Sequence, residues 1–293
     1  MEHGILRIGE DRLNMRENRW VGFALIALVY AAAITLGVLL YRALPGAFWQ
    51  KLLAADVAAT AFVFVFSVLL KNASVYDPYW SVQPIVILTG FACMRGLTPA
   101  GAALLAGVSI WGVRLTANWA YTFHGLAHQD WRYTMLKEQT GAFYPVVNFL
   151  GIHLFPTLVV YCVTLPAVLV IERGAAWSPL CLPGLLLSLA ATALQGVSDW
   201  QLHRFRKARK SGFIREGFWT HSRHPNYLGE ILMWWGVAFA SIAALKGVWQ
   251  LVFGALLNTL MFLFISIPMA DNHQARKDGF DAYKAETHAL RIF

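Results

Sequence analysis

The chain has 293 residues, of which 58% are hydrophobic and only 14% are charged. Soluble domains are about 45–50% apolar and about 25% charged, so this composition excludes an ordinary soluble globular protein. A formal net charge of +8 in such an apolar chain indicates loop topology and contact with anionic lipid, not a nucleic-acid partner. Three cysteines without CxxC or Cys/His spacing predict neither a metal site nor a disulfide framework.

Polar residues 1–19 precede a series of apolar blocks whose lengths suit a hydrocarbon core of about 30 Å. We expect 1–19 to form a cytoplasmic tail and 20–293 to form a single transmembrane domain. The blocks lie at 20–41, 52–70, 82–95, 98–123, 146–171, 180–204, 229–245 and 247–268. The third block is short, and the last two form either a tight hairpin or one broken element. The pattern therefore predicts an all-α, polytopic integral membrane helical bundle with seven to eight transmembrane helices.

Lysine and arginine residues are distributed unequally between alternate loops. Seventeen fall in the N-terminal tail and in loops 71–81, 124–145, 205–228 and 269–293, and five fall in the loops between these. Because positively charged loops tend to stay in the cytoplasm, the bias places both termini on the cytoplasmic side. It places every loop with a polar motif there too, so a cavity formed by these loops would face the cytoplasm.

The first polar motif lies between the second and third blocks, at 74–81. It sets Asp77 beside Tyr76 and Tyr79. An acid–phenol pair near an apolar pocket can polarise a carbonyl group or donate a proton. The alternative is structural: Asp77 caps a helix that begins at Pro78.

A polar stripe follows in block 98–123, with spacings of 3, 4 and 3 that place its members on one helical face. The stripe consists of Trp111, Arg114, Asn118 and Tyr121. An arginine inside a span normally faces a partner or a wet cavity, although Arg114 could also snorkel or form a structural pair. Beyond it, Arg132 and Tyr133 belong to an aromatic, basic stretch that would suit either a cavity mouth or an interfacial belt.

A second stripe ends block 180–204 and again occupies one helical face. It consists of Gln195, Asp199, His203 and Arg206. Asp199 needs a partner in its apolar surroundings, and Arg206 or Arg114 could supply one, as part of a site or as a structural ion pair. Two polar stripes on two helices predict a shared polar cavity.

The loop 205–228 carries six lysine and arginine residues among glycines and aromatic residues. Such a loop could hold a phosphorylated, ring-bearing ligand, although plain topology or lipid contact would also explain the charge. Ten residues at 221–230 add a dense set of donors where the next span begins, with Pro225 suited to the first helical position. These are five residues that can donate, His221, Arg223, His224, Asn226 and Tyr227, together with the carboxylate of Glu230.

After the last block, a helix carrying Asn272 and Arg276 is expected at the cytoplasmic surface. It would either cover the cavity as a lid or form a surface tail.

The order of these motifs resembles the steroid 5-alpha-reductase superfamily, and more closely its bacterial membrane branch. Asp199 and Arg206, the basic loop, the string Ser-Arg-His-Pro-Asn-Tyr-x-Gly-Glu and a short Phe-x-x-Tyr tail carry the resemblance over about 190–293. The superfamily also holds sterol reductases and isoprenylcysteine carboxyl methyltransferases. The resemblance implies an integral membrane fold, in a bacterial inner membrane, that encloses NADPH in its C-terminal half at about 180–293.

By this resemblance the chain is a monomeric NADPH-dependent oxidoreductase that reduces the carbon–carbon double bond of an apolar enone, steroid-like or another lipid, taken from the bilayer. Family members polarise the enone oxygen with an acid and a tyrosine on early spans, which points to Asp77 with Tyr76 or Tyr79, and to Tyr121 in reserve. Fifteen of the polar residues named above would bind the cofactor: Arg114, Asn118, Arg132, Tyr133, Gln195, Asp199, Arg206, His221, Arg223, His224, Asn226, Tyr227, Glu230, Asn272 and Arg276.

Two other functions stay open. One is an S-adenosylmethionine-dependent membrane methyltransferase of the isoprenylcysteine carboxyl methyltransferase type. The other is a non-enzymatic lipid-binding or scaffold protein. The sequence contains no G-x-G-x-x-G motif after a strand, so a dinucleotide would not be held on a Rossmann unit.

Overall fold

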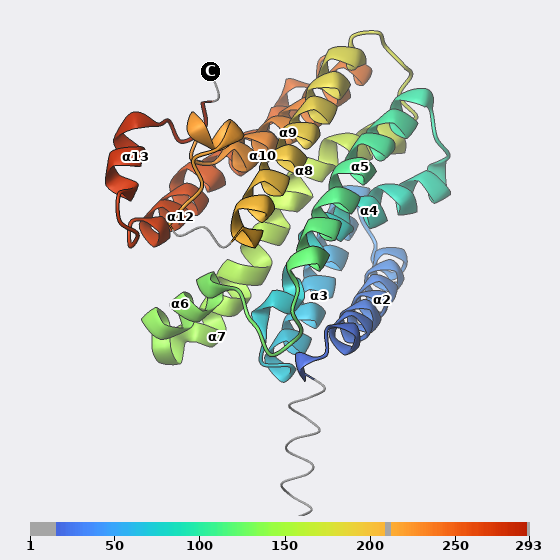
Figure 1. Ribbon diagram of the computed structural model, residues 1–293. Coiled ribbons are helices and arrows are strands. Elements are labelled where there is room, and N and C mark those ends of the chain that lie inside the picture. The colour runs from blue at the N-terminus through green and yellow to red at the C-terminus, as the bar shows by residue number, and fades with distance from the viewer. Residues whose placement is uncertain (1–15, 209–211, 292–293) are drawn as a thin grey trace, which may run out of the picture. The chain divides into compact units, whose positions relative to one another are not determined.

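The computed structural model describes residues 16–208 and 212–291, and its regular elements within these ranges are helices (Figure 1). Seven helices in this part of the chain are long and apolar enough to cross a membrane. They span Arg19–Ala43, Phe48–Leu69, Pro99–Thr122, Trp131–Glu172, Cys181–Lys207, Pro225–Ala244 and Trp249–Gln274. The prediction of an all-α, polytopic membrane protein with seven to eight spans is therefore confirmed.

The chain forms two compact units, which we describe one at a time. Unit 1 comprises residues 1–86 and 115–161, and unit 2 comprises residues 87–114 and 162–293. Three helices begin in one unit and end in the other: α4 (Tyr79–Arg95), α5 (Pro99–Thr122) and α8 (Phe155–Glu172). The single domain expected from 20 to 293 stays a prediction.

Unit 1 is built on the adjacent helices α2 (Arg19–Ala43) and α3 (Phe48–Leu69). Asn18 caps α2, because its side chain accepts hydrogen bonds from the backbone N–H groups of Trp20 and Val21. A short 3₁₀ turn, Ala73–Tyr76, follows α3 and carries the first polar motif into the core of the unit. That core packs Tyr30, Val63, Tyr76, Tyr79 and Phe123 together.

The rest of unit 1 is a broken helical segment. It contains α6 (Trp131–Thr140), a 3₁₀ turn (Gly141–Phe143), α7 (Tyr144–Val147) and a π-helical turn (Asn148–Leu154), and it leads into α8. The predicted block at 146–171 is therefore not one regular helix. A π-helical turn leaves part of the backbone out of the regular hydrogen-bond ladder and is common near functional sites.

Unit 2 is dominated by α9 (Cys181–Lys207) and α10 (Pro225–Ala244), which lie side by side (Figure 1). Gly184 on α9 and Gly236 on α10 let the two backbones approach closely, since a Cβ atom at either position would lie under 3 Å from the other helix. Small residues of this kind are typical of helix contacts in membranes.

The last two apolar blocks form two separate helices. After α10, Lys246 adopts a left-handed conformation, and a 3₁₀ turn (Trp249–Leu251) leads into α11 (Val252–Met261). A π-helical turn (Phe262–Ser266), α12 (Ile267–Gln274) and α13 (Phe280–Glu286) complete the described chain, with a 3₁₀ turn at Gly217–Thr220 ahead of α10. The hairpin alternative predicted from the sequence is thus correct.

Large apolar side chains are exposed along the predicted spans. Leu28 and Leu39 on α2, Leu186 on α9 and Phe253 on α11 all keep more than half of their surface outside the protein. Soluble proteins rarely leave so many large apolar groups in water, whereas lipid tails accommodate them. This pattern supports the assignment as an integral membrane protein.

Candidate functional site

The polar stripes of α5 and α9 meet inside unit 2. The guanidinium of Arg114 on α5 donates from Nη1 to Oδ2 of Asp199 at 2.7 Å, and from Nη2 to Oε1 of Gln195 at 2.6 Å. Of the two partners that the sequence allowed for Asp199, the structure selects Arg114. Arg206 lies on the exposed last turn of α9.

A carboxylate from α10 extends this arrangement. Glu230 is 4% exposed, and it accepts hydrogen bonds from the indole N–H groups of Trp111 and Trp234, both at 2.9 Å, and from the amide of Gln195. One turn earlier on α10, the amide of Asn226 donates to Oδ1 of Asp199 at 3.1 Å. The result is one continuous set of contacts across three helices. We call it the unit 2 network: Trp111, Arg114, Gln195, Asp199, Asn226, Glu230 and Trp234.

Local sequence explains why these side chains meet. Spacings of three and four residues align the polar groups on α5 and on α9, and Pro225 begins α10 just before Asn226. Gly229 then brings α10 against α9, because a Cβ atom there would lie 2.7 Å from the backbone oxygen of Ala191. Gln195 can therefore reach both Arg114 and Glu230.

The network leaves one donor unused. Among the residues that the structure describes, the buried Nε–H group of Arg114 has no hydrogen-bond partner, although both terminal nitrogens of this guanidinium do. A buried donor without an acceptor is costly. An acceptor atom on a bound ligand would satisfy this donor.

Two further residues of the predicted string, Arg223 and His224, contact the segment that follows the last span. Arg223 forms hydrogen bonds with the Asp271 carboxylate, at 3.3 Å to each oxygen, and with the backbone oxygens of Lys284 and Thr287. His224 contacts Oδ1 of Asp271 through Nε2 at 2.8 Å and stacks on Tyr227. The backbone N–H groups of Arg223 and His224 also donate to residues 288 and 289.

The first polar motif forms a separate cluster in unit 1. The hydroxyl of Tyr133 donates to the carboxylate of Asp77, and Arg132 donates to both carboxylate oxygens of Asp130, at 2.8 and 3.1 Å. Burial raises the pKa of Asp77 to about 6, although Arg132 and the hydrogen bond from Tyr133 act in the opposite direction. Tyr133, predicted as a cofactor ligand, is thus the partner of the predicted catalytic acid.

Tyr79 is paired with a different acid. Its hydroxyl lies 3.2 Å from Oδ1 of Asp56 on α3, and the amide of Gln83 donates to Oδ2 of the same carboxylate. All three side chains are buried. Asp56 and Gln83 were not among the site residues predicted from the sequence. The available signal was an acidic residue inside the apolar block 52–70, where a carboxylate requires a partner.

Tyr76 belongs to a neighbouring set of hydroxyl groups. Its hydroxyl lies 2.8 Å from that of Thr157 on α8, which in turn lies 2.9 Å from the hydroxyl of Thr60 on α3. The ring of Tyr76 stacks on Tyr79 with centroids 5.4 Å apart and also contacts His153. Tyr76 and Tyr79 therefore lie together, and the acid that contacts Tyr79 is Asp56.

The other predicted site residues are placed as follows. In unit 1, Asn118 is half-buried on α5, and Tyr121 is 61% exposed on the same helix. In unit 2, His221 lies exposed in the loop before α10, and Asn272 and Arg276 are exposed at and after the end of α12. The acid that reaches the predicted string from this segment is Asp271, the neighbour of Asn272.

Among the described residues, no group of three or more histidine, cysteine or acidic side chains is arranged to hold a metal ion.

The helices and the two buried polar clusters define a polytopic membrane protein with ionisable groups inside its spans, a feature that commonly marks a functional site. The chain belongs to the family described as protein of unknown function DUF1295, whose model matches residues 63–287. This is the steroid 5-alpha-reductase-like family, which confirms the resemblance at family level, while the bacterial branch stays a prediction.

An uncharacterized protein of Schizosaccharomyces pombe is 24% identical to the chain over a region that covers 57% of each protein. The chain thus spans little more than half the length of this relative. No solved structure matches the chain.

Proposed function

We propose that the protein is a membrane-embedded, NADPH-dependent reductase that acts on the carbon–carbon double bond of an apolar enone, steroid-like or another lipid, drawn from the bilayer. The observation that carries the proposal is the buried contact between the Tyr79 hydroxyl and the Asp56 carboxylate. It provides the acid–phenol pair that an enone reductase needs to bind a carbonyl oxygen. Asp56 takes the place that the sequence analysis gave to Asp77.

The chemistry explains the need for such a pair. When a hydride adds to the β carbon of an enone, the double bond shifts and negative charge gathers on the carbonyl oxygen. A hydroxyl donor held in a dry site stabilises this charge, and donors of this kind are worth several kcal/mol in enzymes. A carbonyl oxygen that replaces Asp56 as the acceptor of the Tyr79 hydroxyl would receive that hydrogen bond.

The surrounding residues keep the pair in position. Gln83 donates to the second oxygen of Asp56, and the ring of Tyr79 packs between Tyr30, at 5.6 Å, and Tyr76, at 5.4 Å. Within the described residues no lysine or arginine forms an ion pair with Asp56, so its carboxyl group contacts only uncharged donors. To complete the reaction, water or a phenol gives a proton to the α carbon.

Unit 2 supports the choice of cofactor. NADPH, when bound, supplies the hydride. The free Nε–H group of Arg114 and the amide of Asn226 are donors that suit ribose or phosphate oxygens, and Asp199 suits a ribose hydroxyl. These are the residues that the resemblance assigns to the cofactor.

Methyl transfer explains the acid–phenol pair less well. Transfer of a methyl group from S-adenosylmethionine to a carboxylate removes negative charge from the acceptor oxygen. A buried hydroxyl donor would then stabilise the starting carboxylate more than the transition state, which opposes catalysis.

The cofactor can be tested first, without a known substrate. Thermal unfolding in detergent would be followed with NADPH, NADH and S-adenosylmethionine in parallel. We expect NADPH to raise the melting temperature of the wild type and to have no effect on Asn226→Ala. Stabilisation by S-adenosylmethionine alone would replace the reductase by the methyltransferase, and a response to none of the three would exclude both.

The acid–phenol pair is tested by NADPH oxidation with a panel of apolar enones. Tyr79→Phe should retain NADPH binding and lose activity by about 10²–10³-fold, as expected for the loss of one donor to a developing oxyanion. Asp56→Asn should also retain NADPH binding and lose activity, because the carboxylate that holds the Tyr79 hydroxyl in position is gone. Tyr41→Phe, at the far end of α2, is the matched control and should retain full activity. If both site variants turn over enones at the wild-type rate, the assignment of the pair is wrong.

A further inference from the structure

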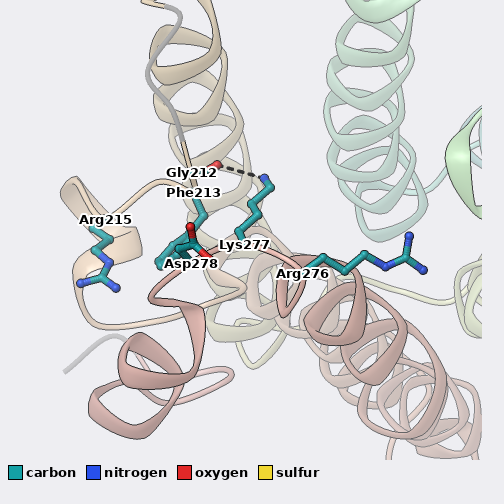
Figure 2. A pocket seen from close by; sticks show the side chains of 6 residues that line it. All are labelled: Gly212, Phe213, Arg215, Arg276, Lys277 and Asp278. Atoms are coloured by element: carbon teal, nitrogen blue, oxygen red, sulfur yellow. Dashed lines mark hydrogen bonds between the residues drawn. The ribbon is translucent and has the colours of Figure 1, made fainter.

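Unit 2 contains a pocket that the roles above do not use. It has a volume of about 520 Å³ and is lined by six residues from the loop before α10 and the segment after α12: Gly212, Phe213, Arg215, Arg276, Lys277 and Asp278 (Figure 2). This volume lies within the range of small-molecule sites, about 300–1,000 Å³. Both lining segments are outside the predicted spans, so the pocket borders the aqueous phase.

The lining carries more positive than negative charge. Figure 2 shows Lys277 reaching the backbone oxygen of Gly212, at 3.0 Å, with Arg215 and Arg276 extending to opposite sides of it. Within residues 16–208 and 212–291, Arg276 forms no ion pair, and Asp278 pairs with none of the three cations. Asp278 is exposed and balances only part of this charge.

Lys277 is partly buried and lies near a further cation, Arg206. Its pKa is lowered, first by partial burial and then by the positive charge of Arg206 at the end of α9. Like charges held together in this way bind an anion favourably, because an anion relieves their repulsion. Lys277 thus lies near both Arg206 and Arg276, which were predicted from the sequence as cofactor ligands.

The rest of the lining includes an aromatic ring that is packed against other rings. Phe213 packs on Phe280 and Tyr283 with ring centroids 5.2 and 5.0 Å apart, and the guanidinium of Arg215 lies over the rings of Phe213 and Tyr283. Arg215 is fixed further by a hydrogen bond of 2.8 Å to the backbone oxygen of Gly279. Aromatic and guanidinium planes beside further cations suit a nucleobase with an attached phosphate.

We propose that this pocket binds the 2′-phosphorylated adenosine end of the nucleotide cofactor, and that Lys277 and Arg276 hold the 2′-phosphate that distinguishes NADPH from NADH. The inference rests on the proposed reductase function and adds to it the basis of cofactor selectivity. A phosphomonoester is close to dianionic at neutral pH and offers three strong acceptor oxygens, which match ammonium and guanidinium donors. NADH carries a neutral ribose hydroxyl at the same position.

The test measures binding of NADPH and NADH by thermal shift or titration calorimetry on the full chain in detergent. Lys277→Gln keeps an amide donor for Gly212 but removes the charge, and Arg276→Gln changes a side chain that is exposed in the structure. Each variant should lose about tenfold or more in NADPH affinity, with a change of less than about twofold for NADH. Adenosine 2′,5′-bisphosphate should compete with NADPH on the wild type and compete less well on either variant.

Arg173→Gln provides the matched control, because Arg173 is an exposed arginine just after α8 and outside the pocket. It should retain the wild-type preference for NADPH. Wild-type binding of NADPH with an unchanged NADPH-to-NADH ratio in both pocket variants would overturn the pocket assignment alone. Failure of the wild type to bind either dinucleotide would overturn the proposed function and this inference together.

A second experiment tests whether the pocket binds the phosphate group of a lipid headgroup instead of a nucleotide. The wild type and Lys277→Gln would be reconstituted in nanodiscs of phosphatidylcholine, with and without 30% phosphatidylglycerol. We expect the stabilisation by phosphatidylglycerol to be the same in both proteins. If Lys277→Gln loses this stabilisation and retains its NADPH affinity, the pocket binds lipid headgroups and the nucleotide assignment is wrong.

Discussion

The close approach of α9 and α10 gives the sharpest prediction for stability. Replacing Gly236 by alanine would place a Cβ atom 2.6 Å from both the backbone oxygen of Gly184 and the backbone nitrogen of Ser188. Ordinary contact begins near 3.4 Å, so the new methyl group would be roughly 0.8 Å too close on two sides. Both neighbours are backbone atoms of a helix, and neither can rotate away.

The magnitude follows from two opposing effects. Overpacking of a well-packed interior costs about 1–3 kcal/mol, and the rigid neighbours place Gly236→Ala at the upper end of that range. Alanine also stabilises the helix by about 1 kcal/mol relative to glycine, because its helix propensity is higher. We therefore expect a net destabilisation of about 2 kcal/mol, together with weaker NADPH binding, because a wider helix pair would pull Gln195 and Glu230 apart.

Gly107 on α5 supplies the matched control. It is also a buried glycine within a helix of unit 2, but a Cβ atom there would have no atom within 4 Å. Gly107→Ala should be neutral or stabilising by up to about 1 kcal/mol. Unfolding of the two variants would be compared by thermal melting in one detergent, at one protein concentration. Equal melting temperatures would refute the reasoning, since only one of the two positions has another backbone against it.

Two further predictions concern charged groups. Burial raises the pKa of Asp77 to about 6 from 3.8, so between about pH 4 and pH 6 the folded protein retains a proton that the unfolded chain has lost. The stability should therefore fall as the pH rises through this window, by at most about 3 kcal/mol, and melts of Asp77→Asn at pH 4.5 and 7 should lack this contribution. Asp199→Leu leaves the guanidinium of Arg114 without its carboxylate and should lower stability by about 3 kcal/mol. The double variant with Arg114→Met should recover part of this loss in the same melting assay, and a double variant less stable than Asp199→Leu would contradict the ion pair.

The spans were predictable because the thickness of a bilayer sets a length that apolar blocks must match. That Arg114 and Asp199 belong to polar helix faces could also be predicted, since spacings of three and four residues align polar groups on a helix. Which of Arg114 and Arg206 pairs with Asp199 could not be predicted from the sequence. It depends on how α5 packs against α9, which no local pattern encodes.

The same limit explains what was missed. Asp56 lies alone in an apolar block, and nothing near it in the sequence points to Tyr79 or Gln83, which are 23 and 27 residues away. Asp271 contacts Arg223 and His224 from 48 and 47 residues away, while its neighbour Asn272, favoured from the sequence, is exposed. One residue of difference on a helix rotates a side chain by about 100°, so a helix placed correctly can still present the wrong residue.

The contacts of Arg223 have a practical consequence for anyone who expresses the protein. Its guanidinium donates hydrogen bonds to the backbone oxygens of Lys284 and Thr287. The adjacent Ser222 forms an isolated parallel β-bridge with His288. The string before α10 and residues 284–289 thus fold as one piece, although they are some 60 residues apart. A truncation within 284–291, or an insertion there, therefore amounts to a mutation of that string.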